Sequence, residues 1–231
     1  MANEQKKGLS TNSNAYTLIY AAVLVIIVAF LLSFVSSVLN DKKVANQQVD
    51  KKSQILAAIN VTDANVEDAF AKYIKSDAII NANGEVVKEN GGFDVDFNNQ
   101  SSADQLPIYI CEADGETKYI IPMSGKGLWG GISGYIGLKS DKNTIDGIFF
   151  AHESETPGLG AEITADYFRE PFKGKHIKNA AGEVVSVAVL KKGKTAEGQE
   201  QVDAVTGATL TSNGVDAMLK EALGKYSNYL K

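Results

Sequence analysis

The sequence has few of the residues from which proteins build metal or redox centres of their own. Cys111 is the only cysteine among 231 residues, and His152 and His176 are the only histidines. A single cysteine excludes an internal disulfide and any zinc or iron–sulfur site that needs several thiolates from this chain. Two histidines leave too few ligands for a self-contained metal centre, so no metal site is expected. Redox chemistry in this chain therefore requires a cofactor taken from outside.

An excess of positive charge is also missing. Lysine and arginine together number 23 against 28 aspartates and glutamates, which gives a formal net charge of −5. Nucleic-acid-binding domains carry a basic surface, so no nucleic-acid partner is expected. The hydrophobic share of 44% and the charged share of 22% are typical of a globular chain. The length suits one domain plus an anchor.

Charge is absent altogether from residues 8–40, and the 24 residues Tyr16–Leu39 are almost continuously apolar. As a helix they would extend about 36 Å at ~1.5 Å per residue, which is enough to cross a hydrocarbon core of about 30 Å. A cleaved signal peptide is the alternative, but its apolar core is usually only about 7–15 residues long. The weak cleavage site would be formed by Ser33, Ser36 and Ser37. An uncleaved transmembrane helix over residues 16–39 is predicted.

The lysines that flank this segment give only a slight preference for one orientation. Two lysines precede it, and four lysines interspersed with two aspartates follow it. By the positive-inside rule this pattern leans toward a cytoplasmic domain. The residues concerned are Lys6, Lys7, Asp41, Lys42, Lys43, Asp50, Lys51 and Lys52. The charge count alone does not settle the side.

The rest of the chain reads as helices followed by short strands and turns. Two helices are expected after the anchor, one over residues 41–59 and a second with Thr62 or Asp63 as its N-cap. The apolar face of the second helix comprises Val66, Phe70, Tyr73 and Ile74. Strands are expected at Ala78–Ile80, Glu85–Lys88, Pro107–Cys111, Lys118–Met123, Gly134–Leu138, Ile145–Ala151 and Val184–Leu190, the first four forming two hairpins through Asn83-Gly84 and Asp114-Gly115.

Two more helices complete the pattern. A short one is expected at Ile163–Phe168, and a C-terminal one carries an apolar stripe. The stripe consists of Val215, Met218, Leu219, Ala222 and Tyr226. The elements together predict an α+β fold of antiparallel hairpins and short helices behind a single transmembrane helix. The expected parts are an N-terminal tail (1–15), the transmembrane helix (16–39), a helical connector (40–77) and a C-terminal domain (78–231).

A turn of small residues runs into the start of the C-terminal helix. It reads DAVTGATLTSNGV from Asp203 to Val215, with Thr211 or Ser212 as the expected N-cap. Unpaired backbone N–H groups and the positive end of the helix dipole make such a turn a natural anion site. Gly207 and Ala208 lack the bulk that would keep a phosphate away from the backbone. By itself, the pattern is more typical of an ordinary capped helix start than of a phosphate site.

Two other segments are rich in glycine. HESETPGLG, His152–Gly160, follows an expected strand, and its Pro157 and Gly158 force a turn. No second histidine stands four residues from the first, so the zinc-helix motif is excluded. SGKGLWGG, Ser124–Gly131, contains Trp129, the only tryptophan. This side chain either caps the core or forms a wall for a flat aromatic ligand.

Together these three segments resemble FMN-binding domains. The run Asp203-x-x-Thr206-Gly207-Ala208-Thr209 is similar to the flavinylation motif of these domains, in which the last threonine carries the phosphoester. The run Glu155–Gly160 is similar to the segment that the family places beside the flavin. GKGLW, Gly125–Trp129, and Gly134-Tyr135 resemble in particular the C subunits of sodium-translocating NADH:quinone oxidoreductases. The related G subunits of Rnf ferredoxin:NAD oxidoreductases usually lack the Gly-Leu-Trp. The resemblance covers the anchor and the domain.

The resemblance implies FMN bound covalently through its phosphate to Thr209. A separate flavin transferase would take the FMN from FAD with magnesium. Asp203 would serve recognition or catalysis by that transferase, or merely form the turn. No catalytic residue is expected in this chain. The residues expected to bind the cofactor are Leu128, Trp129, Glu155, Thr156, Gly158, Leu159, Thr206, Gly207, Ala208 and Thr209.

The resemblance also implies a place in a complex of six subunits in the bacterial inner membrane. There this chain would relay electrons on the path from NADH to ubiquinone or menaquinone, coupled to sodium export. The FMN domain would lie in the periplasm, on the side of the transferase and against the lysine count. Because the span holds no acidic residue, it is not expected to form the sodium path. The alternatives are an Rnf G subunit, a membrane-tethered binding module without flavin, and a hydrolase with Thr209 as nucleophile, which lacks a nearby base.

Overall fold

The computed structural model describes residue 11, residues 13–97 and residues 105–231. The chain divides into two units, Met1–Gln48 and Val49–Lys231. The predicted N-terminal tail falls mostly on residues 1–10 and 12, and it therefore lies outside the described residues together with Lys6 and Lys7.

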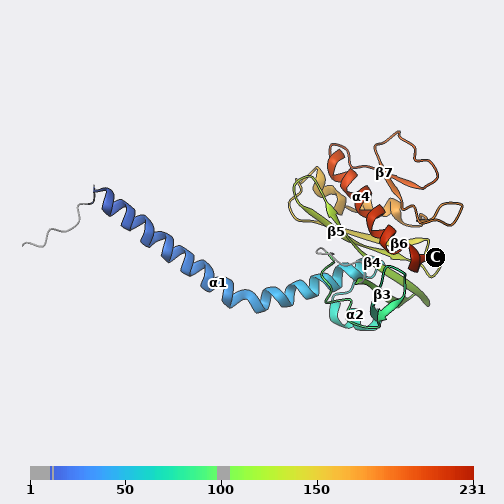
Figure 1. Ribbon diagram of the computed structural model, residues 1–231, viewed down its shortest axis with the longest axis horizontal. Coiled ribbons are helices and arrows are strands. Elements are labelled where there is room, and N and C mark those ends of the chain that lie inside the picture. Colours follow the sequence, from blue (N-terminus) through green and yellow to red (C-terminus); the bar gives the residue numbers. More distant parts are fainter. Residues whose placement is uncertain (1–10, 12, 98–104) are drawn as a thin grey trace, which may run out of the picture. The chain divides into compact units, whose positions relative to one another are not determined.

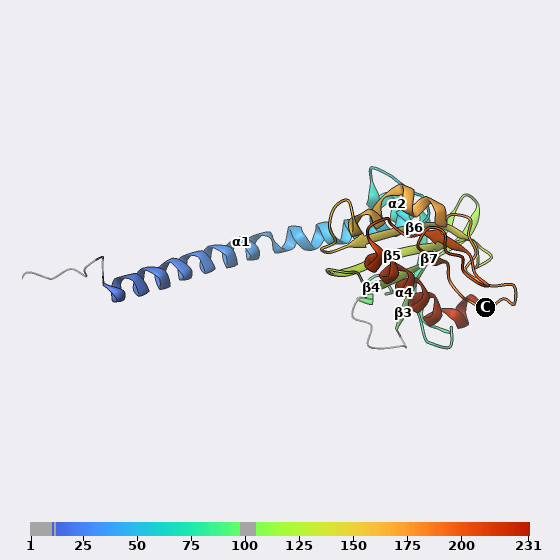
Figure 2. The ribbon, with the colours of Figure 1, turned by 90° about the horizontal axis from the view of Figure 1, so that it is seen from above.

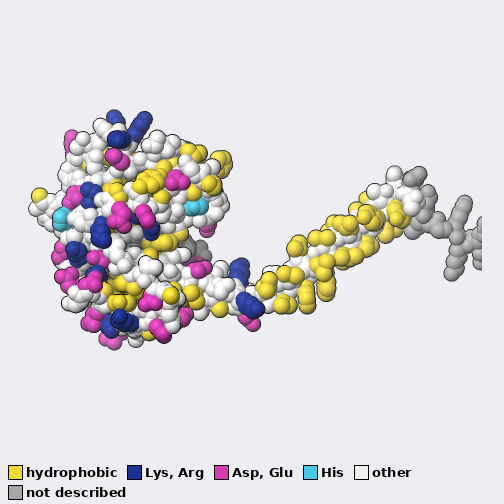
Figure 3. All heavy atoms as spheres, turned by 180° about the vertical axis from the view of Figure 1, so that it is seen from behind, with side chains coloured by type: hydrophobic (Ala, Val, Ile, Leu, Met, Phe, Trp, Pro, Cys, Tyr) yellow, Lys and Arg dark blue, Asp and Glu magenta, His cyan; other side chains and the backbone are white. Residues whose placement is uncertain are grey.

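The first unit consists mainly of helix α1, Asn14–Ala57, whose last residues belong to the second unit. The predicted transmembrane segment 16–39 is helical throughout, and its side chains are exposed. Figure 3 shows hydrophobic side chains covering this stretch and charged side chains where it ends. Within the described part of the chain, α1 is the one helix long and apolar enough to cross a membrane.

The second unit is built on a six-stranded sheet with the order β2-β1-β3-β4-β5-β6, in which all neighbours are antiparallel. The strands are β1 Ile74–Ile80, β2 Val86–Lys88, β3 Leu106–Ala113, β4 Glu116–Lys126, β5 Gly131–Leu138 and β6 Ile145–His152. Both predicted hairpins are confirmed. Asp114 and Gly115 have φ angles of 57° and 79°, which a two-residue hairpin turn requires. Lys126 pairs with Gly131, so the glycine-rich loop (Gly127–Gly130) closes the β4-β5 hairpin.

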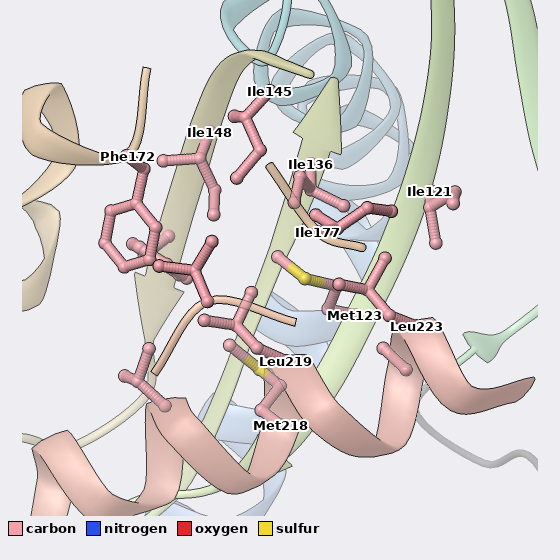
Figure 4. Packing of buried hydrophobic residues seen from close by; sticks show 14 of the residues in the cluster. Ile121, Met123, Ile136, Ile145, Ile148, Phe172, Ile177, Met218, Leu219 and Leu223 are labelled. Atoms are coloured by element: carbon pink, nitrogen blue, oxygen red, sulfur yellow. The ribbon is translucent and has the colours of Figure 1, made fainter. Parts of the chain in front are cut away.

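Helix α4, Thr209–Lys225, lies across one face of this sheet (Figure 1). The five residues of the predicted apolar stripe are all buried. In Figure 4, Met218, Leu219 and Leu223 of α4 point toward Met123 and Ile136 of the sheet. Burial of one such side chain contributes roughly 1.5–3 kcal/mol. The stripe therefore fixes α4, and with it the turn at its start, on the sheet.

The opposite face of the sheet is covered by the end of α1 and by helix α2, Val66–Tyr73 (Figure 2). Ile55 and Leu56 of α1 pack there in one cluster with Tyr109 of β3. A second, two-stranded parallel sheet is formed by β7 Ala188–Leu190 and β8 Gln201–Asp203. Two helical layers around an antiparallel sheet confirm the predicted α+β class.

The predicted helix Ile163–Phe168 is wrong as one continuous element. Ala165 has extended backbone angles (φ −76°, ψ 149°) and breaks it. The segment instead forms η2 Gly160–Thr164, α3 Asp166–Arg169 and η3 Glu170–Phe172. The break lets Ile163 and Phe168 both enter the same core cluster.

Two further boundaries differ from the prediction. The predicted strand Val184–Leu190 forms only over its last three residues, because Ser186 has a φ of 74°, which a strand does not accommodate. The N-cap of α2 is Asn65, whose side chain accepts a hydrogen bond from the Asp68 N–H at 3.3 Å. Asp63 instead accepts from the Asn65 N–H at 2.9 Å and forms the preceding turn. Ile74 begins β1 and is not part of the helix.

Candidate functional site

The three segments singled out in the sequence meet around one carboxylate, that of Glu155. Its Oε1 accepts a hydrogen bond from the Trp129 N–H of the glycine-rich loop at 2.8 Å. Its Oε2 accepts a hydrogen bond from the Thr211 hydroxyl in the first turn of α4 at 2.6 Å. Glu155 is only 4% exposed. Segments separated by 26 and 56 residues are thus joined by one side chain.

The glycines of these segments leave the space that this arrangement requires. A Cβ built on Gly127 would collide with Oε1 of Glu155. A Cβ on Gly160 would collide with Oε2 and would lie 2.6 Å from the Thr211 hydroxyl oxygen. Gly207 has a φ of 81°, and a Cβ there would lie 3.1 Å from a methyl carbon of Leu159. The turn before α4 is therefore in close proximity to the ETPGLG run.

The end of β4, at the entry to the glycine-rich loop, rests directly on α4. A Cβ on Gly214 would collide with the carbonyl oxygen of Lys126 and would lie 3.2 Å from the carbonyl carbon. A Cβ on Gly125 would lie 2.8 Å from Cβ of Met218. These two glycines allow the backbone of the hairpin to approach the helix more closely than side chains would permit.

The start of α4 differs from the prediction. The helix begins at Thr209 with Ala208 as its N-cap, which provides no side-chain hydrogen bond. The predicted capping by Thr211 or Ser212 is wrong, because both lie inside the first turn and their hydroxyls are used elsewhere. Thr211 donates to Glu155, and Ser212 accepts from the Val205 N–H at 3.1 Å. Ser212 thereby fixes the preceding turn, while the N-terminus of the helix lacks a side-chain cap.

The expected cofactor-binding residues are mostly accessible. Thr206, Gly207 and Thr209 are exposed at the turn, and Ala208 is buried. The remaining exposed members of the set are Leu128, Trp129, Thr156, Gly158 and Leu159. Trp129 is 68% exposed, so the possibility that it caps the core is excluded. Glu155 is the buried exception. Direct contact of any of these residues with FMN stays a prediction.

A pocket of about 840 Å³ opens between the glycine-rich loop and α4. Leu128 and Trp129 line it from the loop, and Gly214, Ala217 and Met218 line it from the helix. Such a volume is in the range of small-molecule and cofactor sites. Neither Thr209 nor residues 155–159 are among its lining residues. The expected site residues therefore do not all line one cavity.

Sequence reasoning missed Thr211 as a partner of Glu155. The available signal was helical spacing, since Thr211 stands four residues before the buried Val215 and so on the same face. A buried hydroxyl on that face needs a partner. The sequence does not show which one, because the acceptor is 56 residues away.

Glu155 is held in its ionised form. Burial would raise the pKa of this carboxyl, but hydrogen bonds from the Thr211 hydroxyl and from backbone N–H groups of the loop outweigh it and lower the pKa. An ionised carboxylate is an acceptor only, and this matches the N–H and O–H donors that surround it.

Comparison with known proteins is consistent with this geometry. Residues 127–224 match the model of the FMN-binding domain. The chain is 30% identical over 230 residues to the C subunit of the Na(+)-translocating NADH-quinone reductase of Haemophilus ducreyi, covering 90% of this chain and 89% of that protein. It is 44% identical to the crystal structure of the corresponding C subunit from Parabacteroides distasonis, with a TM-score of 0.79 over 84% of this chain and 97% of that one. NqrC of Shewanella oneidensis is 28% identical with a TM-score of 0.67 over 80% and 98%.

The matched family model thus contains the glycine-rich loop, the run Glu155–Gly160 and the turn before α4, the three segments that meet in the structure. The similarity to the Haemophilus protein further extends over about nine-tenths of both chains. The chain belongs to the family of the C subunits of Na(+)-translocating NADH-quinone reductases.

Proposed function

We propose that this chain is an electron-relay subunit of a sodium-translocating NADH:quinone reductase and carries FMN through a phosphoester bond to Thr209. The observation that carries the proposal is the position of Thr209. It is the exposed first residue of α4, and the N-cap before it provides no side-chain hydrogen bond. Family membership and the FMN-binding domain over residues 127–224 support the identity of the cofactor.

The turn before α4 suits a phosphate. The first N–H groups of a helix have no acceptor within the helix, and the helix dipole favours an anion there. Gly207 and Ala208 let a phosphate approach the backbone, and the exposed hydroxyl of Thr206 can donate to it. Bound FMN supplies the electron-transfer chemistry that the side chains of this chain lack. The role of the protein is to hold the cofactor and to set its surroundings.

Exposed apolar side chains on the glycine-rich loop and beside this turn suit an aromatic ring. Trp129, Leu128, Leu159 and Leu210 are between 44% and 68% exposed. Exposure of large apolar side chains in one region marks a ligand or partner surface. We infer that Trp129 and Leu128 contact the ring from the glycine-rich loop, and that Thr156, Gly158 and Leu159 contact it from the ETPGLG run.

Attachment requires a separate enzyme. The transfer forms a bond between Thr209 Oγ1 and the FMN phosphorus, breaks the pyrophosphate bond of FAD and releases AMP. It needs a base, and neither histidine is placed at the turn by a contact in the structure. His152 accepts a hydrogen bond from the Glu155 N–H at 3.3 Å, and His176 contacts Glu200. Asp203 ends β8 and is exposed, so it is accessible to a magnesium-dependent flavin transferase.

We further propose that α1 anchors the chain in the bacterial inner membrane by a single span, with the domain in the periplasm. Restricting the carrier to the membrane raises its effective concentration near the other five subunits. Cys111 is fully buried, and burial raises the pKa of its thiol to about 12. A protonated, buried thiol is unreactive, which suits an oxidising compartment. We propose that the chain consists of a tail (1–15), a span (16–39), a connector (40–77) and an FMN domain (78–231).

The path from NADH to ubiquinone or menaquinone and its coupling to sodium export belong to the complex, and this chain supplies one relay in it. Similarity to the C subunit along nine-tenths of the chain supports this assignment over an Rnf G subunit. The exposed Trp129 and the accessible threonine turn support it over a tethered module without flavin.

The test is the intact mass of the chain extracted from membranes of the native host. We expect the mass from sequence plus one phosphoester-linked FMN, together with flavin fluorescence of the denatured band in a gel. Both signals disappear in Thr209→Ala, while the chain still assembles into the membrane. Persistence of the added mass in that variant, located on Thr206 or Thr211 by peptide mapping, would show that the assignment of the attachment site is wrong.

A further inference from the structure

The carboxylate of Glu155 is buried without a counter-charge. Within residues 13–97 and 105–231, no lysine, arginine or histidine forms an ion pair with it. It is satisfied by the Thr211 hydroxyl and the Trp129 N–H, with the N–H groups of Leu128 and Gly130 also directed toward it. A buried charge is costly unless such donors surround it. The carboxylate therefore fixes the conformation of the glycine-rich loop, because it accepts hydrogen bonds from the backbone N–H groups of that loop.

The fit leaves the carboxylate little freedom to move. Glycines from two different segments, Gly127 and Gly160, stand where any Cβ would collide with one of its two oxygens. The Glu155 N–H is itself held by Nδ1 of His152 at 3.3 Å. Both ends of the residue, backbone and carboxylate, are thus tied to neighbours.

The two groups that Glu155 joins belong to the two halves of the flavin site. Trp129, whose N–H is held, presents its ring outward and lines the pocket beside α4. Thr211, whose hydroxyl is held, lies two residues after Thr209 in the first turn of α4. Displacement of either Trp129 or Thr211 changes the position of the tryptophan relative to Thr209.

We propose that Glu155 is a positioning residue, which joins the glycine-rich loop to the first turn of α4 and so sets the place of Trp129 relative to Thr209. Its effect on the flavin rests on the proposed function, whereas its effect on the loop does not. The carboxylate acts through Trp129 and Thr211 rather than as a ligand of the cofactor.

The first experiment measures the mobility of the glycine-rich loop in protein without the cofactor. Trp129 is the only tryptophan of the chain, so the time-resolved fluorescence anisotropy of the full chain in detergent reports this one side chain. All variants carry Thr209→Ala to exclude FMN. We expect Thr211→Val, which keeps the shape and removes the donor, to increase the amplitude of fast local motion at least twofold. Glu155→Gln, which places an amide donor among donors, should do the same.

Two matched variants separate the proposed role from a general loss of stability. Thr211→Ser retains the hydroxyl and should restore the anisotropy decay of the parent. Thr164→Val removes a threonine hydroxyl that donates to the Ala161 carbonyl at 3.0 Å outside this cluster, and it should leave the decay unchanged. Unaltered anisotropy in both Thr211→Val and Glu155→Gln would overturn the proposal, whatever happens to the melting temperature.

The second experiment measures the midpoint potential of the flavin in chains that retain Thr209. In flavin-loaded protein, Thr211→Val should shift the midpoint potential of the flavin, and Thr211→Ser should return it to the value of the parent. An unchanged potential in Thr211→Val despite a loosened loop would overturn the link between Glu155 and the flavin. Absence of the FMN mass from the parent chain would instead refute the proposed function, while the anisotropy experiment still decides the role of Glu155 in the loop.

Discussion

Substitution of Gly214 by alanine tests the close contact between α4 and the β4-β5 hairpin. This contact predicts a loss of stability, whereas the intrinsic helix preference of alanine predicts a gain. Alanine is favoured over glycine inside a helix by up to about 1 kcal/mol. Gly214 lies within α4, so propensity alone predicts that Gly214→Ala stabilises the chain. In the structure, however, the new Cβ would collide with the carbonyl oxygen of Lys126, a backbone atom that cannot rotate away.

The size of the stability loss follows from the movement that the collision forces on the backbone. Relieving the collision requires the β4-β5 hairpin to separate from α4, and overpacking of this kind costs about 1–3 kcal/mol. Gly125 would lose its close approach to Met218 at the same time. We therefore expect Gly214→Ala to be destabilised. The added Cβ would lie 2.2 Å from a backbone oxygen, so the upper part of this range, about 2–3 kcal/mol, applies, and helix propensity offsets up to about 1 kcal/mol of it. The net loss is then about 1–3 kcal/mol. Because one kcal/mol corresponds to about 2–4 °C in a chain of this size, the melting temperature should fall by about 2–12 °C.

Gly224 provides the matched control on the same helix. A Cβ there would meet nothing within 4 Å, so Gly224→Ala should gain up to about 1 kcal/mol from helix propensity. Differential scanning calorimetry of both full-length variants in the same detergent measures the difference. Because Lys126 leads into the glycine-rich loop, Gly214→Ala should also alter the flavin absorbance spectrum, and Gly224→Ala should not.

Two outcomes would refute this reasoning. A transition of Gly214→Ala at or above that of the parent would mean that the helix and the loop do not approach as closely as the structure describes. An equal loss in both variants would mean that α4 rejects added methyl groups generally, and that the contact with Lys126 has no particular role.

Three further predictions concern the tryptophan, the carboxylate and the orientation. Trp129→Ala should shift the flavin absorbance or midpoint potential and leave attachment and melting temperature nearly unchanged, because the ring is 68% exposed; a large loss of stability with an unaltered spectrum would contradict this. The pKa of Glu155 is lowered on folding, so its ionised form stabilises the fold above the unfolded pKa of about 4.3. The stability difference between the parent and Glu155→Gln should therefore be constant above about pH 5 and shrink as the pH falls through the folded pKa, as chemical denaturation at a series of pH values can check. Protease added to intact spheroplasts should digest the FMN domain and spare the extreme N-terminus; full protection of the domain until lysis would reverse the orientation and support the lysine count.

Much of the architecture was readable from the sequence because the physical causes are local. An uncharged and almost continuously apolar run of 24 residues needs no partner to be recognised as a candidate span. The Asp114-Gly115 turn imposes its own backbone angles, and the stripe from Val215 to Tyr226 follows from helical spacing alone. The motif ending at Thr209 is likewise contiguous, and the structure places this residue at an accessible helix start. Each of these features depends on residues within a few positions of one another.

The tertiary structure decided what depends on distant segments. Whether Trp129 is buried, what the carboxylate of Glu155 contacts and why Gly214 is a glycine all depend on residues 26 to 88 positions away. Ser186 likewise interrupts a segment of strand-forming composition through a backbone angle that composition does not reveal. Hydrogen bonds and close backbone contacts act over about 3 Å between atoms that the fold brings together. The local motif identified Thr209, and only the packed chain showed that the buried carboxylate of Glu155 joins Thr211, two residues further along α4, to the backbone N–H of Trp129.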